Sequence, residues 1–137
     1  MSKRAVKLSV TRKDSDLERA FDTLLRQLAP EIPEPQKNYR FNFPLNKMEL
    51  DRAWVDWRAG VELDGGTWSK TKSGHNSGMG IRNRCLKGNF AVLSGWRVLW
   101  FTSDLLRDKP DYCIEAVRSL LELPFAEPLI AKLVEGD

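Results

Sequence analysis

Cysteine and histidine are scarce in this sequence of 137 residues, which contains two cysteines, Cys85 and Cys113, and one histidine. Two cysteines without a short metal-ligand spacing fit a reduced cytosolic protein better than a disulfide scaffold. No apolar run approaches the roughly 18 residues that span a membrane, and the N-terminus has no apolar signal core. We therefore expect a cytoplasmic protein that does not enter a membrane.

The sequence also lacks internal repeats, low-complexity segments and a Walker phosphate loop. Gly65 and Gly66 are adjacent, but no helix start with the Walker pattern follows them, so they indicate a tight turn after a strand. Hydrophobic residues make up 42% of the chain and charged residues 30%, which is typical of a soluble globular protein. The length predicts one domain, which we place at 15–137 after a basic N-terminal arm at 1–14.

Positive charge is distributed unevenly, although the net charge is only +3. One basic cluster precedes the first acid and consists of Lys3, Arg4, Lys7, Arg12 and Lys13. A second cluster consists of Lys70, Lys72, Arg82, Arg84 and Lys87. Two basic regions on either side of an acidic strand favour a polyanionic partner, because lysine and arginine neutralise phosphates. The alternative is that these side chains only keep the surface soluble.

The order of predicted elements indicates an α/β protein. Ser15 and Glu18 have the spacing of a capping box at a helix start. The apolar stripe of that helix consists of Leu17, Ala20, Phe21, Leu24, Leu25 and Leu28. The next predicted elements are strands at 39–43, 50–54 and 59–64, a helix at 81–93, a strand at 96–101, a short helix near 105 and a helix from 110. This order predicts a three-layer α/β/α sandwich on a mixed sheet.

Two further expectations concern the second half of the chain. In the helix at 81–93, the residues expected to face inward are Ile81, Cys85, Phe90 and Leu93. The strand at 96–101 should be buried and parallel to a neighbour, because a helix precedes it.

Acidic residues in the two middle strands predict a metal site. Glu62 and Asp64 alternate with apolar residues, which places both carboxylates on one strand face about 7 Å apart. If residues 55–58 form a turn, Asp51 lies opposite Glu62 with Cβ atoms about 5 Å apart. Three carboxylates this close raise one another's pKa unless a cation lies between them, and a hard divalent cation takes oxygen ligands. The alternative is the ordinary polar outer face of an antiparallel sheet.

Two other acid–base candidates each have a structural alternative. His75 lies in a loop rich in glycine, serine and lysine, a dozen residues past the acids, so proton transfer is one option and a solvated side chain is the other. Glu18 is explained as a cap partner without any further role.

Several short motifs together resemble a known nuclease family. They are 50–54 (LDRAW), 61–68 (VELDGGTW), His75 with Gly78 and Gly80, Lys87 with Asn89, and 95–99 (GWRVL) with Phe101 and Thr102. In order and spacing they resemble phage and bacterial endonuclease-like proteins related to the very short patch repair endonucleases, within the PD-(D/E)XK nuclease superfamily. The resemblance covers roughly residues 16–122. It implies a restriction-endonuclease-like fold and magnesium-dependent cleavage of a nucleic acid in a bacterial or phage-infected cell.

The resemblance also implies roles for individual residues. Asp51 matches the metal-binding aspartate, Glu62 the acid of the (D/E)XK element, and Glu18 a helix glutamate that some relatives direct into the site. Asp64 stands where the superfamily motif expects lysine, as in the repair-type branch. Lys87 is then the first candidate for the missing positive charge and His75 the second.

Two basic residues depart from the family pattern. Relatives commonly carry an acid where this chain has Arg84 and an aromatic residue where it has Arg52. Both changes add positive charge near the expected phosphate path. We therefore expect nucleic-acid contacts from Arg52, Lys70, Lys72, Arg82 and Arg84.

The resulting hypothesis is a Mg²⁺-dependent endonuclease that hydrolyses phosphodiester bonds in DNA, with Mn²⁺ as a substitute ion. Asp51 and Glu62, with Asp64 and the Leu63 carbonyl as further ligands, would hold one or two ions that lower the pKa of the attacking water. The first alternative is a DNA-binding or accessory protein that keeps the fold without cutting. A weaker alternative is a structural protein whose acids form surface salt bridges. A homodimer is left open.

Overall fold

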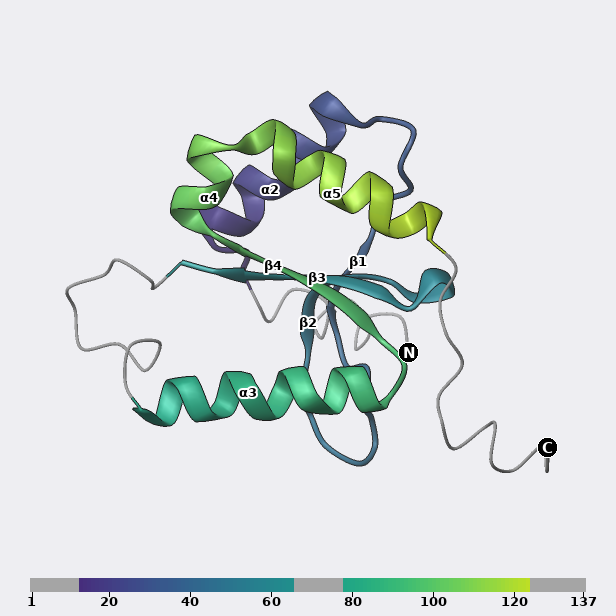
Figure 1. The fold of residues 1–137 in the computed structure, drawn as a ribbon, viewed down its shortest axis with the longest axis vertical. Coiled ribbons are helices and arrows are strands. Elements are labelled where there is room, and N and C mark those ends of the chain that lie inside the picture. The colour runs from purple at the N-terminus through teal and green to yellow at the C-terminus, as the bar shows by residue number, and fades with distance from the viewer. Residues whose placement is uncertain (1–12, 66–77, 124–137) are drawn as a thin grey trace, which may run out of the picture.

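The protein folds into three layers, with a four-stranded sheet between two layers of helices (Figure 1). The computed structural model describes residues 13–65 and 78–123. Helices α2, α4 and α5 cover one face of the sheet and α3 covers the other. The elements are α2 (Asp16–Leu28), β1 (Gln36–Tyr39), β2 (Leu50–Trp54), a 3-10 turn (Val55–Trp57), β3 (Ala59–Asp64), α3 (Gly78–Leu93), β4 (Arg97–Thr102), α4 (Ser103–Asp108) and α5 (Pro110–Glu122). The predicted α/β sandwich is confirmed.

The sheet is mixed and has the order β1-β2-β3-β4. The first three strands form an antiparallel meander, and β4 lies parallel to β3 after the crossover through α3. Trp54 pairs with Ala59, as the short turn between β2 and β3 predicts. A helix between two strands brings the chain back to the same end of the sheet, which is why β4 is parallel. As the edge strand in this order, β4 leaves Trp100 39% exposed.

Helix α2 begins at the predicted capping box. The Ser15 side chain accepts from the Glu18 amide at 3.1 Å, and Glu18 Oε1 accepts from the Ser15 amide at 2.7 Å. Phe21 and Leu25 are buried as expected, but Ala20 and Leu28 are exposed. The buried face of α2 instead includes two acids, Glu18 and Asp22, because a buried arginine on β2 requires negative partners on this helix.

Two apolar cores lie within the described residues, and the first is the larger. It consists of Phe21, Leu25, Ala29, Trp54, Val61, Phe101, Leu106, Cys113, Ile114 and Val117. The second consists of Leu50, Ala53, Ala91 and Trp96. Val61 and Phe101 belong to the first core, which includes residues of α2 and α5. Glu62 alternates with Val61 and therefore faces the opposite side of β3, toward α3.

The first strand lies earlier in the chain than the sequence predicts. It covers Gln36–Tyr39, whereas residues 41–45 form a turn. Its partner β2 begins at Leu50, which pairs with Tyr39, so residues after Tyr39 have no strand opposite them. The aromatic rings of Tyr39 and Phe41 pack near Trp96 instead, with centroids 5.6 and 6.4 Å from that ring.

The inward face of α3 also differs from the prediction. Ile81, Phe90 and Leu93 are 50%, 40% and 76% exposed, and Ala91 is the buried residue of this helix. Side chains that contact the sheet from α3 include basic ones, because the facing surface of β3 carries acids. The helix starts at Gly78, three residues before the predicted start. Gly95, which has a φ of 86°, follows its end, as predicted.

The last described helices agree with the sequence pattern. The Thr102 hydroxyl accepts from the Leu105 amide at 3.3 Å and caps α4. Helix α5 has Pro110 in its first turn and buries Cys113, Ile114, Val117 and Leu120. The expected basic arm, apart from residues 13 and 14, lies outside the described residues. So do residues 129–134, for which the apolar pattern of the sequence predicts a small helix. Among the described helices, none is long and apolar enough to cross a membrane.

Candidate active site

Two carboxylates lie together where the backbone pairing of β2 with β3 ends. That pairing runs from Trp54–Ala59 to Arg52–Val61, and Asp51 and Glu62 come next in the same register. The Asp51 amide donates to Glu62 Oε2 at 2.8 Å, and the Leu63 amide donates to Asp51 Oδ2 at 2.7 Å. Each side chain therefore satisfies an amide of the neighbouring strand. The predicted proximity of Asp51 and Glu62 is present.

Lys87 reaches this pair from α3, in the third layer. Its Nζ donates to Glu62 Oε1 at 2.6 Å. Glu62 is only 5% exposed, and its pKa is raised to about 7, chiefly because burial disfavours the charged form. The neighbouring Asp51 charge contributes to this rise, and the Lys87 ammonium opposes it. A buried acid beside another acid and a lysine is a common arrangement at catalytic sites.

Asp64 occupies the same side of β3 as Glu62 but meets a different cation. Arg84 Nη1 lies 3.3 Å from Asp64 Oδ2. Arg84 and Lys87 are three residues apart on α3 and therefore share a helix face. The structure thus brings Asp51, Glu62 and Lys87 together, with the Asp64–Arg84 pair beside them. Within residues 13–65 and 78–123, no group of three or more His, Cys, Asp or Glu residues is arranged to hold a metal ion.

The prediction that Arg52 contacts nucleic acid is wrong, because Arg52 is fully buried. Its side chain points away from α3 and binds both carboxylate oxygens of Asp22, at 2.8 and 2.9 Å. Arg52 Nη1 lies 3.4 Å from Glu18 Oε2. The strand alternation places Arg52 on the opposite face from its neighbours of the acidic site. A phosphate in solution cannot reach this guanidinium.

Glu18 makes structural contacts with both of its carboxylate oxygens. One carboxylate oxygen caps α2 and the other faces Arg52. The predicted catalytic role of Glu18 is therefore not supported by its contacts. Asp22, which the sequence reasoning missed, holds Arg52 more closely than Glu18 does. The available signal was its position four residues after Glu18, on the same face of a helix.

Of the remaining candidate residues, the structure describes Leu63 and Arg82. Leu63 packs partly buried against the larger core, and its main chain borders Asp51. Arg82 is exposed on α3. Lys70, Lys72 and His75 lie outside the described residues. Nucleic-acid contacts from Arg82, Lys70 and Lys72, and a proton-transfer role for His75, stay predictions.

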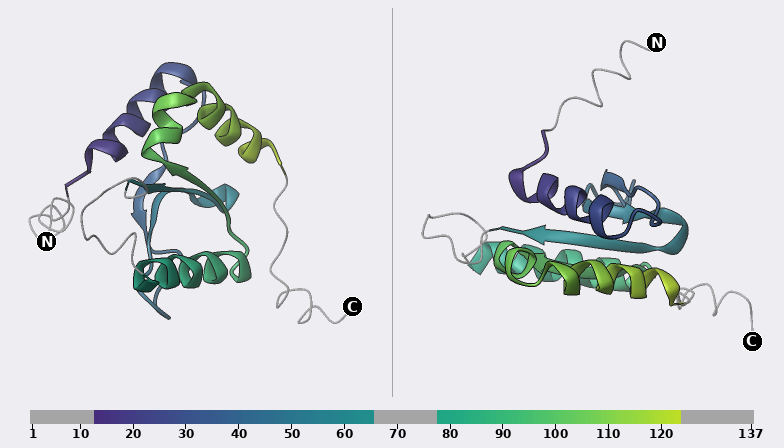
Figure 2. Two further views of the ribbon diagram at one scale, coloured as in Figure 1. Left: turned by 60° about the vertical axis from the view of Figure 1, so that its left-hand side comes forward. Right: turned by 90° about the horizontal axis from the view of Figure 1, so that it is seen from above.

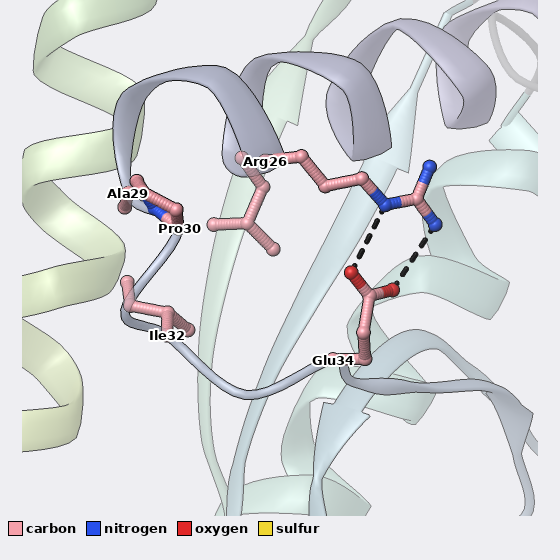
Figure 3. A pocket seen from close by; sticks show the side chains of 6 residues that line it. Arg26, Ala29, Pro30, Ile32 and Glu34 are labelled. Atoms are coloured by element: carbon pink, nitrogen blue, oxygen red, sulfur yellow. Dashed lines mark hydrogen bonds and ion pairs between the residues drawn. The ribbon is translucent and has the colours of Figure 1, made fainter.

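Two pockets lie away from the carboxylates. One of about 110 Å³ lies below the end of α2 and is lined by Leu25, Arg26, Ala29, Pro30, Ile32 and Glu34. Figure 3 shows the two parallel hydrogen bonds between Arg26 and Glu34 at its side, which measure 3.0 and 3.1 Å. A wider one of about 610 Å³ is lined by Tyr39, Phe41, Val55, Arg58, Leu93, Ser94 and Trp96. Neither is lined by a predicted catalytic residue.

Comparisons with known proteins concern the fold. No protein-family model matches the chain, and no match was found among curated proteins. Among solved structures, the catalytic domain of the homing endonuclease I-Bth0305I is similar, with a TM-score of 0.52 and 17% sequence identity. The match covers 78% of this chain and 94% of that domain. The chain therefore has the fold of a known nuclease catalytic domain, while the relation to repair endonucleases stays a prediction.

Proposed function

We propose that this protein is a metal-dependent endonuclease that hydrolyses phosphodiester bonds in DNA. The observation that carries the proposal is the contact of Asp51, Glu62 and Lys87 across two strands and a helix. The fold shared with a homing endonuclease catalytic domain supports the same activity. Lys87 then supplies the positive charge of the motif lysine, because this chain has Asp64 at the position of that lysine.

The donor set fits a hard divalent cation. Asp51 and Glu62 offer carboxylate oxygens, which Mg²⁺ and Mn²⁺ prefer. Each oxygen that accepts a hydrogen bond here has a further lone pair for a cation. Burial and the Asp51 charge raise the pKa of Glu62 to about 7, and a bound cation would offset both effects. Asp64 and the Leu63 carbonyl are proposed as additional ligands.

The described residues divide the chemistry between them. When bound, Mg²⁺ supplies Lewis acidity toward a phosphate oxygen and a lower pKa for water. Asp51 and Glu62 would hold the ion, and their hydrogen bonds to strand amides keep both carboxylates oriented. Lys87 orients Glu62 in the free protein and is close enough to the site to stabilise negative charge on the phosphate. Arg82 and Arg84 on α3 are proposed to contact neighbouring phosphates.

Cleavage assays test the proposal directly. Plasmid, single-stranded and branched DNA would be incubated with Mg²⁺ or Mn²⁺, with and without EDTA. Asp51→Asn, Glu62→Gln and Lys87→Met should each lower the cleavage rate by about 100-fold or more, because each removes a charge on which the reaction depends. The matched controls are Asp111→Asn and Lys109→Met, which change exposed charges at the start of α5. Full activity in both acid variants would refute the site.

A second function is favoured by one observation. Arg84 Nη1 lies 3.3 Å from Asp64 Oδ2, so its charge already compensates that of Asp64. A protein that keeps the nuclease fold and binds DNA without cutting it would be consistent with this pairing. Binding of all three DNA forms with no cleavage of any of them would support this alternative over the endonuclease.

A further inference from the structure

A buried arginine connects the helix layer of α2 to the strand that carries Asp51. Arg52 has no exposed surface, although the same face of β2 and β3 contributes Trp54 and Val61 to the apolar core. Its guanidinium donates two hydrogen bonds to the Asp22 carboxylate and lies within 3.4 Å of Glu18. Figure 2 shows α2 lying along the sheet, so that these acids come from a neighbouring layer. The guanidinium is thus held by a separate element.

The same guanidinium also holds the main chain of the site. Arg52 Nη1 donates to the carbonyl oxygen of Asp51 at 2.6 Å. The Asp51 amide and carboxylate are bound to β3, through Glu62 and Leu63. Asp51 is therefore fixed on both sides of its Cα atom, toward β3 by its own strand contacts and toward α2 by Arg52.

Stability alone does not explain an arginine at this position. Removing a charge from water is costly, and replacing buried ion pairs by apolar residues of similar volume is often neutral or stabilising. An apolar residue would extend the core formed by Trp54 and Val61. A guanidinium differs from such a residue because it can bind a carboxylate through two nitrogens and still donate to a third group. Here the third group is the Asp51 carbonyl.

We infer that Arg52 is a positioning residue for the metal site, which holds Asp51 beside Glu62 through the Asp51 main chain. This inference rests on the proposed function, because it assigns Arg52 to the proposed cation site. Residues that orient metal ligands without touching the ion commonly change metal affinity by 10–100-fold when they are replaced. The capping glutamate, Glu18, extends this support to the start of α2.

The test compares metal affinity with stability in the full chain. Mn²⁺ binding would be measured by isothermal titration calorimetry, and stability by urea unfolding without metal. Arg52→Lys keeps the charge but not the planar set of donors, so its Kd for Mn²⁺ should rise by about 10-fold or more. Asp22→Asn should shift the Kd in the same direction while retaining a hydrogen-bonding partner for Arg52.

The control is Arg97→Lys, at another strand arginine whose guanidinium donates to main-chain carbonyls, those of Leu120, Leu123 and Trp57. It should lower the urea midpoint and leave the Kd unchanged. If Arg52→Lys is folded and binds Mn²⁺ like the wild type, the inference is overturned while the proposed function stands. If Arg52→Lys does not fold, Asp22→Asn decides on the same criterion. A wild-type protein that binds no Mn²⁺ would overturn the proposed cation site and this inference together.

Discussion

Glu62 occupies an environment that disfavours its own negative charge. It is nearly buried, Asp51 lies beside it, and its pKa is raised to about 7 by burial and by that neighbour. The Lys87 ammonium offsets part of this effect through a 2.6 Å hydrogen bond. Surface acids that serve only solubility do not meet these conditions, since water screens them. Of the described acids, Glu62 is therefore the one that we would replace first.

The two cysteines should differ sharply in reactivity. Burial raises the pKa of Cys113 to about 11, whereas Cys85 is exposed on α3. At pH 8 roughly one Cys113 in a thousand would be a thiolate, which is the reactive form. Titration of the folded protein with a disulfide reagent should show one fast thiol, and guanidinium should reveal the second. Cys85→Ser should remove the fast phase, and rapid reaction of both thiols in the native state would contradict the burial of Cys113.

The helix and strand elements contribute to the site in different ways. β2 and β3 hold Asp51 and Glu62 through amide hydrogen bonds, so their geometry follows from strand register. Helix α3 contributes Arg84 and Lys87, yet Ala91 is its buried residue and several of its apolar side chains are exposed. Helix α3 is therefore held to the sheet both by its ion pairs with β3 and by Ala91 in the smaller core.

Two glycine substitutions should have opposite effects on these elements. At Gly60 in β3, an added Cβ would lie 2.8 Å from Leu50 Cδ1 and 3.1 Å from the Arg52 carbonyl. Gly60→Ala should therefore destabilise the protein by about 1–3 kcal/mol. At Gly88 in α3 the nearest atom, on Trp100, would be 3.9 Å away.

Gly88→Ala should accordingly stabilise the protein by about 0.5–1 kcal/mol, because alanine loses less backbone freedom in a helix. Urea unfolding of both variants gives the sign of each change. Loss of stability in Gly88→Ala would indicate that α3 packs more tightly against β4 than the structure shows.

The whole molecule is organised as a sheet whose two faces have different characters. The α2 and α5 face carries the larger apolar core and the buried Arg52. The α3 face carries the acids together with Arg84 and Lys87. The larger apolar core therefore lies on the first face, and the charged groups that could meet a ligand lie on the second.

Metal binding should therefore be visible in the stability of the whole protein. Any ion that binds the folded state alone adds about 2.7 kcal/mol at a concentration one hundred times its Kd. Melting with Mn²⁺ or Mg²⁺ should occur at a higher temperature than melting with EDTA. The shift should vanish in Asp51→Asn and Glu62→Gln and persist in Asp111→Asn. An equal shift in all four proteins would place the ion elsewhere.

Local spacing was enough to predict the strand register and the helix start. The two-residue period of β2 and β3 and the short turn between them place Asp51 next to Glu62. The capping box of Ser15 and Glu18 likewise depends on residues three apart. Such features are predictable because both partners lie in one short segment, where backbone geometry fixes their separation.

The tertiary structure alone decided which side chains meet across layers. Arg84 and Lys87 on α3 meet acids on β3, and those contacts join residues twenty or more positions apart. Arg52 is buried because Asp22 on another element compensates its charge, a pairing that no local pattern encodes. The sequence by itself thus determined the two carboxylates and their strands. The packing of α3 against the sheet decided that Lys87 faces Glu62. A buried ion pair forms only where another element brings the opposite charge into contact.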